Sequence, residues 1–317
     1  MTQIISAAYL LVGLVVLIVG ADALVRGAAQ LAKHLGLSPF AIGVIVVAFG
    51  TSAPELFASI GAAVQGETEL AIGNVVGSNI ANIGLILGIG GMLIAIPVQS
   101  KVRKVEIPIM VALTIVTMVL LTDVVISRFE GGLLLAFLVA YVLYIIKAHS
   151  EDIEHELDET VGEIKPIWVD LIYVIAGIAG LGLGARVLVL GATDLAQSIG
   201  ISAAIIGTTI VAFGTSVPEL AATARAAMTK QSDMAVGSIV GSNVFNLLSV
   251  LGVTAIIKPL SMDHTMDWHL YVMLGIALLL MLWVIVRPVI RRGFALILLV
   301  VYVGYVIVSY AVNPAGS

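Results

Sequence analysis

Ten apolar runs, separated by short polar segments, dominate the sequence. They cover residues of about 3–26, 39–64, 70–96, 105–126, 131–147, 168–192, 202–227, 234–258, 268–287 and 293–312. About 20 apolar residues are enough for a helix to cross a bilayer. The strict alternation of apolar and polar residues that is typical of a transmembrane barrel is absent. The pattern therefore predicts an all-α polytopic membrane protein with ten transmembrane helices.

The second half of the chain repeats the first at a constant offset. The segment GTSAPE at residues 50–55 recurs as GTSVPE at residues 214–219, an offset of 164, and 13 of the 21 residues between 36 and 56 are identical at that offset. Residues 73–82 and 237–246 correspond in the same way. We predict two five-helix repeats, 1–147 and 167–317, joined by the segment 148–166. Since five spans are an odd number, the second repeat is expected to be inverted relative to the first, as in many transporters.

The composition fits a protein that resides in lipid. Hydrophobic residues make up 60% of the chain and charged residues 11%, against about 25% charged residues in soluble domains. The absence of cysteine excludes disulfides and thiolate metal sites. The formal charge of −5 arises largely from the acidic segment 148–166. It gives no indication of nucleic-acid binding, and no protein partner is evident.

The distribution of Lys and Arg predicts the orientation, because these residues favour the cytoplasmic side. With both termini outside, twelve of the 15 basic residues lie in predicted cytoplasmic segments, and Arg128, Arg186 and Lys258 lie on the opposite side. We therefore expect a multi-pass protein of the cell membrane with extracytoplasmic termini and a cytoplasmic segment 148–166.

Three polar features outside the repeated motifs have simple interpretations. The acidic segment 148–166 is a candidate regulatory calcium site, but it lacks the ligand spacing of a calcium loop, and a solvated linker is favoured. The segment 263–269 is a candidate metal site, but an interfacial position for Trp268 is favoured. Asp22 and Arg26, four residues apart, are expected to form an ion pair on one helix face.

The repeated motif places oxygen ligands on one face of a broken helix. Ala48, Thr51, Ser52 and Glu55 share a face by their helical spacing. Pro54 interrupts the helix and frees a carbonyl group four residues earlier. A carboxylate within a membrane is by default a functional-site hypothesis. A glutamic acid that merely packs helices is the alternative. We predict that the second and seventh helices are broken at the midplane, each beside a functional glutamate, Glu55 or Glu219.

The second motif adds neutral polar groups. Asn74, Ser78 and Asn82 are spaced by four residues, and Ser238, Ser242 and Asn246 match them in the second repeat. Hydrogen bonding between helices is the alternative to ligation. Inverted repeats bring their equivalent segments together near the midplane. The combined site offers two carboxylates and several neutral oxygens without His or Cys, which is typical of a hard-cation site such as one for Ca²⁺.

Together these motifs resemble the two alpha repeats of the calcium/cation antiporter superfamily, and most of all the prokaryotic sodium/calcium exchangers. The resemblance implies ten helices in inverted halves, alternating access, Ca²⁺ between the two glutamates, and Na⁺ sites beside it. The ligands implied by position are Ala48, Thr51, Ser52, Glu55, Ser78, Asn82, Ala212, Thr215, Ser216, Glu219, Ser242 and Asn246. Potassium-dependent relatives carry Asp at the position of Asn246, and proton-coupled relatives usually lack the GTS motif. Both departures favour sodium coupling.

The leading functional hypothesis is therefore an electrogenic secondary antiporter that exchanges Ca²⁺ for Na⁺. The ions are transported substrates, and no resident cofactor is expected. A Ca²⁺/H⁺ antiporter that uses the same glutamates is the nearest alternative, and a cation channel is a more distant one. An enzyme is not expected, since the repeated polar face has no nucleophile and base in a triad-like arrangement.

Overall fold

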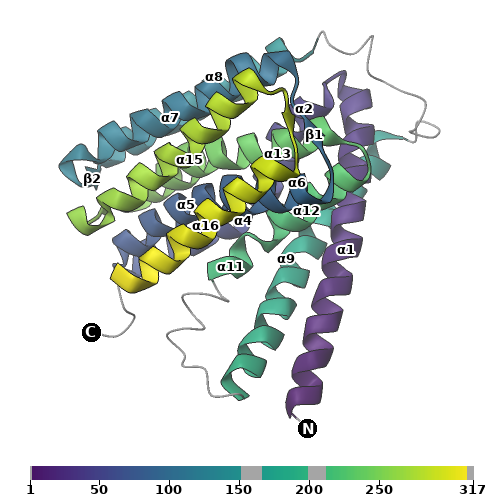
Figure 1. Cartoon of the computed structure of the whole chain (residues 1–317), viewed down its shortest axis with the longest axis horizontal. Coiled ribbons are helices and arrows are strands. Elements are labelled where there is room, and N and C mark those ends of the chain that lie inside the picture. The colour runs from purple at the N-terminus through teal and green to yellow at the C-terminus, as the bar shows by residue number, and fades with distance from the viewer. Residues whose placement is uncertain (1, 151–165, 199–211, 313–317) are drawn as a thin grey trace.

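The computed structural model describes residues 2–150, 166–198 and 212–312 of the chain, and these residues are almost entirely helical (Figure 1). The longer helices are α1 (Thr2–Leu35), α4 (Ala53–Gln65), α5 (Thr68–Ala81), α7 (Ile107–Leu120), α8 (Arg128–Ala148), α9 (Ile167–Ser198), α12 (Val217–Met228), α13 (Ser232–Phe245), α15 (Asp267–Val286) and α16 (Arg292–Val312). The shorter ones are α2 (Pro39–Ile42), α3 (Phe49–Thr51), α6 (Leu87–Leu93), α11 (Ala212–Thr215) and α14 (Leu251–Ile257).

Wider and tighter helical turns interrupt or extend these helices. Wider π-helical turns form η1 (Gly43–Ala48), η2 (Asn82–Ile86), η3 (Val102–Glu106) and η7 (Asn246–Val250). Tighter 3₁₀ turns form η4 (Leu121–Asp123) and η8 (His264–Met266). The equivalent positions of η2 and η7 in the two repeats show that the duplication extends to these local distortions.

Eight described helical segments are long and apolar enough to cross a membrane, and the bent pair Pro39–Thr51 and Ala53–Gln65 makes a ninth. These nine segments correspond to nine of the ten predicted spans. The remaining one, 202–227, falls partly on residues 199–211, outside the described part of the chain. An all-helical polytopic membrane protein is therefore confirmed, and the count of ten helices stays a prediction.

The helices divide into a buried core and a periphery. In the span Ser232–Ile257, 89% of the membrane-crossing window is buried, whereas in Arg292–Ser309 only 17% is. The peripheral helices expose large aliphatic side chains such as Leu11 and Val300, which is favourable only next to lipid. The apolar character of the α13 span instead reflects packing on all sides, so the second repeated motif lies inside the protein.

Contacts between the halves are reciprocal along the pair α1 and α9, which lie side by side (Figure 1). A β-carbon on Gly13 would lie 2.6 Å from the backbone nitrogen of Leu188, and one on Gly177 would lie 2.5 Å from that of Leu24. At the offset of 164, Gly177 is the equivalent of Gly13 and Leu188 is the equivalent of Leu24. The repeated glycines therefore allow the two equivalent helices to pack backbone against backbone, as small residues do in membranes.

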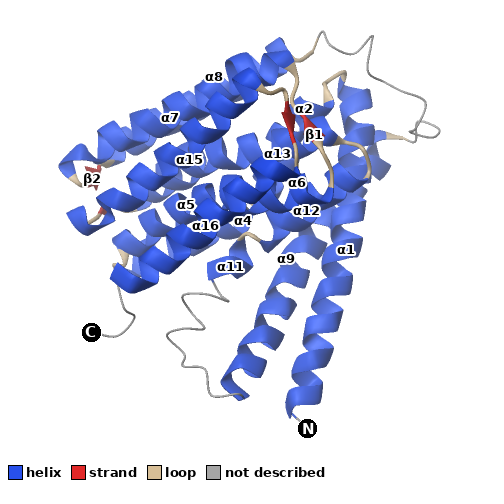
Figure 2. Ribbon diagram, viewed as in Figure 1, coloured by secondary structure: helices blue, strands red, loops and turns tan. Residues whose placement is uncertain are grey.

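Two short antiparallel strand pairs also join the halves. Strand β1 (Ile96–Pro97) pairs with β4 (Val289–Ile290), and β2 (Val125–Ile126) pairs with β3 (Leu260–Ser261). The offset of 164 relates β1 to β3 and β2 to β4, so it converts one pair into the other. The strands are drawn in red in Figure 2, where the two pairs lie at opposite ends of the helical bundle.

Of the three polar features outside the motifs, the structure describes the Asp22–Arg26 pair and segment 263–269. Asp22 and Arg26 form the predicted ion pair, with 2.9 Å between Oδ2 and Nε. Among the described residues no group of three or more His, Cys, Asp or Glu side chains could hold a metal ion, and within segment 263–269 His264 instead contacts Asp267 at 3.1 Å. Most of the acidic segment, 151–165, lies outside the described residues.

Candidate cation-binding site

The site is organised by two helix breaks at equivalent serines. Ser52 separates α3 from α4 with φ −82° and ψ 3°, and Ser216 separates α11 from α12 with φ −90° and ψ 2°. This sparsely populated backbone region is common at active sites. Pro54 and Pro218 each follow within the first turn of the next helix, where a proline lacks no helical hydrogen bond. The first break bends its helix pair by 42°, as the proline motif predicts.

The breaks bring the two predicted carboxylates together. Glu55 and Glu219 are 1% and 3% exposed, and each follows its break by three residues. They lie close enough for their charges to interact. Two buried negative charges repel one another unless a cation or protons compensate them. This pair is therefore a candidate site for positive charge.

Hydroxyl groups cross between the repeats to these carboxylates. Ser52 Oγ donates to Glu219 Oε1 at 3.4 Å, and the Thr51 hydroxyl also lies beside the Glu219 carboxylate. Thr215, the equivalent of Thr51, hydrogen-bonds to Glu55. Each glutamate is thus held by the motif of the opposite repeat, so the site forms only when both halves are in place.

The second motif lies against the same helices. Segment η2, which begins at Asn82, contacts α12, and η7, which begins at Asn246, contacts α4. These contacts are again equivalent under the offset. Ser78 and Ser242, one turn before the two asparagines, are buried as well. The π-helical turns redirect the backbone at each asparagine, and such turns frequently occur at functional sites.

Several buried oxygens of these motifs have no hydrogen-bond partner among the residues that the structure describes. They are Glu55 Oε2, Glu219 Oε2, Ser238 Oγ, Ser242 Oγ and Asn246 Oδ1. Buried polar atoms are nearly always paired, so a cluster of exceptions needs an explanation. Carboxylate, hydroxyl and amide oxygens are the ligands that Ca²⁺ prefers. The donor set therefore fits a hard cation.

The backbone ligands predicted at Ala48 and Ala212 are less completely defined. The carbonyl oxygen of Ala48 accepts hydrogen bonds from Ser52 N at 2.9 Å and from Thr51 Oγ1 at 3.3 Å. A cation at this oxygen would have to replace the longer bond to Thr51. Ala212 begins α11, directly after the residues that the structure leaves undescribed.

Two residues that make polar contacts at the site, Asn74 and Asn79, are absent from the ligand set predicted from the sequence. Asn74 Nδ2 donates to the backbone oxygen of Glu55 at 3.1 Å and to Ser59 Oγ at 2.9 Å. Asn79 accepts a hydrogen bond from Asn246 Nδ2 at 3.1 Å. Both asparagines lie within the first copy of the second motif. The sequence feature that could have identified Asn79 is its repetition as Asn243.

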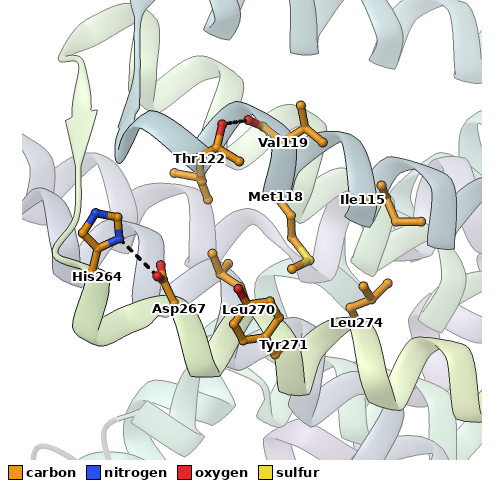
Figure 3. A pocket seen from close by; sticks show the side chains of 10 residues that line it. Ile115, Met118, Val119, Thr122, His264, Asp267, Leu270, Tyr271 and Leu274 are labelled. Atoms are coloured by element: carbon orange, nitrogen blue, oxygen red, sulfur yellow. Dashed lines mark hydrogen bonds and ion pairs between the residues drawn. The ribbon is translucent and has the colours of Figure 1, made fainter.

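A separate cavity lies between α7 and α15 (Figure 3). It has a volume of about 410 Å³ and is lined mainly by aliphatic side chains, including Ile115, Met118 and Leu274. Its polar edge carries the His264–Asp267 pair at 3.1 Å. None of the predicted cation ligands lines it, so it is distinct from the candidate site.

Comparison with known proteins gives the site its context. The family model described as "Sodium/calcium exchanger protein" matches residues 5–147 and again residues 169–311, so the two matches are also 164 residues apart. The chain belongs to the sodium/calcium exchanger family. This confirms the resemblance drawn from the two motif pairs.

Individual relatives match over nearly the whole chain. The protein CaxA of Alkalimonas amylolytica is 38% identical over 312 residues, covering 96% of this chain and 98% of that protein. Sodium/calcium exchanger MaX1 of Methanosarcina acetivorans is 31% identical over 340 residues, covering 95% and 97%. A structure of the sodium-calcium exchanger NCX_Mj has a TM-score of 0.84 at 32% identity, covering 96% and 98%. The fold is therefore that of an exchanger-family membrane protein.

Proposed function

We propose that this chain is a secondary antiporter that exchanges Ca²⁺ for Na⁺ across the cell membrane by alternating access. The observation that carries the proposal is the pair of buried glutamates, Glu55 and Glu219, each bonded by hydroxyl groups of the opposite repeat. Two carboxylates balance the charge of one divalent ion, which offsets the free-energy cost of transferring the ion out of water. The proposed activity is transport, without a chemical reaction or a resident cofactor.

In the proposed mechanism Ca²⁺ binds between the two glutamates and neutral oxygens complete its shell. The proposed ligands are Ala48, Thr51, Ser52, Glu55, Ser78, Asn82, Ala212, Thr215, Ser216, Glu219, Ser242 and Asn246. Na⁺ uses the same glutamates together with serine, threonine and backbone oxygens. Because both ions need these carboxylates, they compete, and each drives the release of the other.

The proposed architecture has ten helices in two inverted repeats, with extracytoplasmic termini and a cytoplasmic segment 148–166. Support comes from the positive-inside distribution and from the reciprocal contacts of the two halves. Alternating access in such folds proceeds by motion of one group of helices against another around a fixed site.

This topology is testable at equivalent positions because the chain has no native cysteine. Arg128 and Arg292, which begin α8 and α16, are exposed and related by the offset of 164. In inverted repeats, Arg128→Cys should react with a membrane-impermeant thiol reagent from outside and Arg292→Cys only from inside. Labelling in intact cells and in inside-out vesicles makes the comparison. Reaction of both positions from the same side would contradict the inversion.

Coupling to sodium is tested with purified protein in liposomes. We expect an outward Na⁺ gradient to drive uptake of calcium-45, and equimolar K⁺ or choline inside the liposomes to support little uptake. A separate arm applies an outward proton gradient in the absence of Na⁺. Uptake driven by protons alone would show that H⁺, rather than Na⁺, is the coupling ion. Uptake independent of any counter-ion would indicate a channel.

A further inference from the structure

Asn79 is a buried amide that joins the two repeats without belonging to the proposed ligand set. Its side chain is on α5 and is 1% exposed. Its Nδ2 lies 3.4 Å from the backbone oxygen of Asn243 and 3.7 Å from Met273 Sδ. A carbonyl oxygen and a thioether sulfur can only accept hydrogen bonds. The amide group of Asn79 is therefore fixed, with its nitrogen toward these two atoms and its oxygen on the other side.

The orientation of Asn79 determines that of Asn246. Asn79 Oδ1 can only accept, and it lies 3.1 Å from Asn246 Nδ2, which donates to it. Asn246 is fully buried, and its Oδ1 has no hydrogen-bond partner in the described part of the chain. The chain of contacts from Asn243 through Asn79 thus leaves the carbonyl end of the Asn246 amide, rather than its NH₂ end, available to a cation.

We propose that Asn79 is a positioning residue that orients the Asn246 amide so that its oxygen faces the transported cation. The inference rests on the proposed function, since it concerns one of the proposed ligands. An amide ligand that points its nitrogen at a cation repels it, and a freely rotating amide has to be ordered on binding. Ordering a ligand group before binding improves affinity by removing that cost.

The reciprocal contact, from Asn82 to Asn243, is not made among the described residues, although both asparagines are present. The equivalent of Asn79 is Asn243, whose Nδ2 donates to Ile239 O in its own helix at 2.8 Å. The equivalent of Asn246 is Asn82, whose Nδ2 has no hydrogen-bond partner within residues 2–150, 166–198 and 212–312. The duplication therefore supplies a matched control: a buried asparagine at the same motif position whose amide is bonded to its own helix.

The test compares Asn79→Leu with Asn243→Leu, since leucine keeps a similar volume but has no hydrogen-bonding group. One buried hydrogen bond to a neutral ligand corresponds to a change of about two- to tenfold in an equilibrium constant. We expect Asn79→Leu to raise the Ca²⁺ concentration for half-maximal exchange about fivefold, with the rate at saturating Ca²⁺ within about twofold of the unsubstituted protein. Asn243→Leu should shift the half-maximal concentration less than about twofold. Equilibrium binding of calcium-45 to the purified protein should show the same ratio.

A double-substitution cycle separates positioning from a general structural effect, because coupled residues are not additive. If Asn79 acts through Asn246, adding Asn79→Leu to Asn246→Ala should change the Ca²⁺ requirement by less than about twofold. Additive effects, or equal effects of Asn79→Leu and Asn243→Leu, would overturn the inference. Asn79→Ser replaces Asn79→Leu if the leucine variant fails to elute as a single species. Absence of Na⁺-dependent exchange in the unsubstituted protein would instead refute the proposed function.

Discussion

Replacing either Glu55 or Glu219 by Gln is expected to lower calcium exchange by about 100-fold or more. Each glutamate is buried and supplies one of the two negative charges proposed to compensate Ca²⁺. Removing one partner of a buried charge interaction costs about 3–5 kcal/mol, and about 1.4 kcal/mol corresponds to a tenfold change in an equilibrium constant. Gln keeps the shape of the side chain and an oxygen that accepts from Ser52 or Thr215, so the loss of exchange measures the effect of removing the charge.

The measurement is initial calcium-45 uptake into sodium-loaded proteoliposomes, with protein incorporation quantified for each variant. Glu69→Gln is the matched control, because Glu69 is an exposed carboxylate at the start of α5 and its removal should change uptake by less than about twofold. Elution of each variant as a single species in detergent shows that it is folded. Exchange near the unsubstituted rate in Glu55→Gln or Glu219→Gln would remove the carboxylate pair from the proposed site.

The sequence predicted the helical spans well because their signal is local. Apolar runs of sufficient length form helices in lipid whatever their partners, since every backbone group must be satisfied within the segment. The first helix shows the limit of this signal: it was expected to end near residue 26 and continues to Leu35. Arg26 and Lys33 resemble the start of a loop, but long basic side chains are compatible with a helix that extends beyond the membrane surface.

The duplication predicted equal halves, and the structure departs from that equality through particular residues. Asp22 pairs with Arg26 and also with Arg225 on α12, where Arg225 Nε lies 2.9 Å from Asp22 Oδ1. The equivalent positions carry Arg186 and Gly61, which cannot form such a pair. A contact between residues 203 apart in the sequence leaves no trace in local periodicity.

Within the site, the helical face of each motif was predictable and the contacts between motifs were not. The spacing of Thr51, Ser52 and Glu55 follows from helix geometry, and the structure brings these residues beside their equivalents. The π-helical turns at Asn82 and Asn246 have no simple sequence code. The bond from Asn246 to Asn79 depends on how two segments 167 residues apart are packed, which only the folded chain defines.

Glu106 shows that a buried carboxylate alone does not identify a transport site. It is fully buried near the start of a predicted span, where the sequence singled out no function. Its Oε1 accepts a hydrogen bond from Tyr144 at 3.0 Å and lies 3.1 Å from His149 Nε2. These contacts join the end of α8 to η3. The Oε1 atom of Glu106 therefore has partners within the protein, although its Oε2, like those of Glu55 and Glu219, has none among the described residues. Glu55 and Glu219 differ from Glu106 in being repeated at the offset of 164 and in lying close enough for their charges to interact.

The second large effect concerns the membrane potential. We expect an inside-positive potential to drive calcium uptake into sodium-loaded liposomes and an inside-negative potential to oppose it. Two ionised glutamates neutralise one Ca²⁺, and the resemblance to sodium/calcium exchangers implies three Na⁺ returning for each Ca²⁺. Such a cycle moves one net positive charge. Moving one charge through the membrane potential is worth about 2.3 kcal/mol per 100 mV, enough to shift the equilibrium calcium gradient more than tenfold.

The potential can be clamped with valinomycin and defined K⁺ concentrations while the Na⁺ and Ca²⁺ gradients are held constant. Uptake by Glu55→Gln liposomes provides the baseline, because any calcium that enters there does not pass through the proposed site. A change of about 100 mV should alter the final calcium gradient in the direction given by the sign of the potential. If the gradient is unaffected, the cycle is electroneutral, and two Na⁺ or two protons must be exchanged for each Ca²⁺. The carboxylate pair would keep its role in that case, because two monovalent cations balance the two glutamates as well as one Ca²⁺ does.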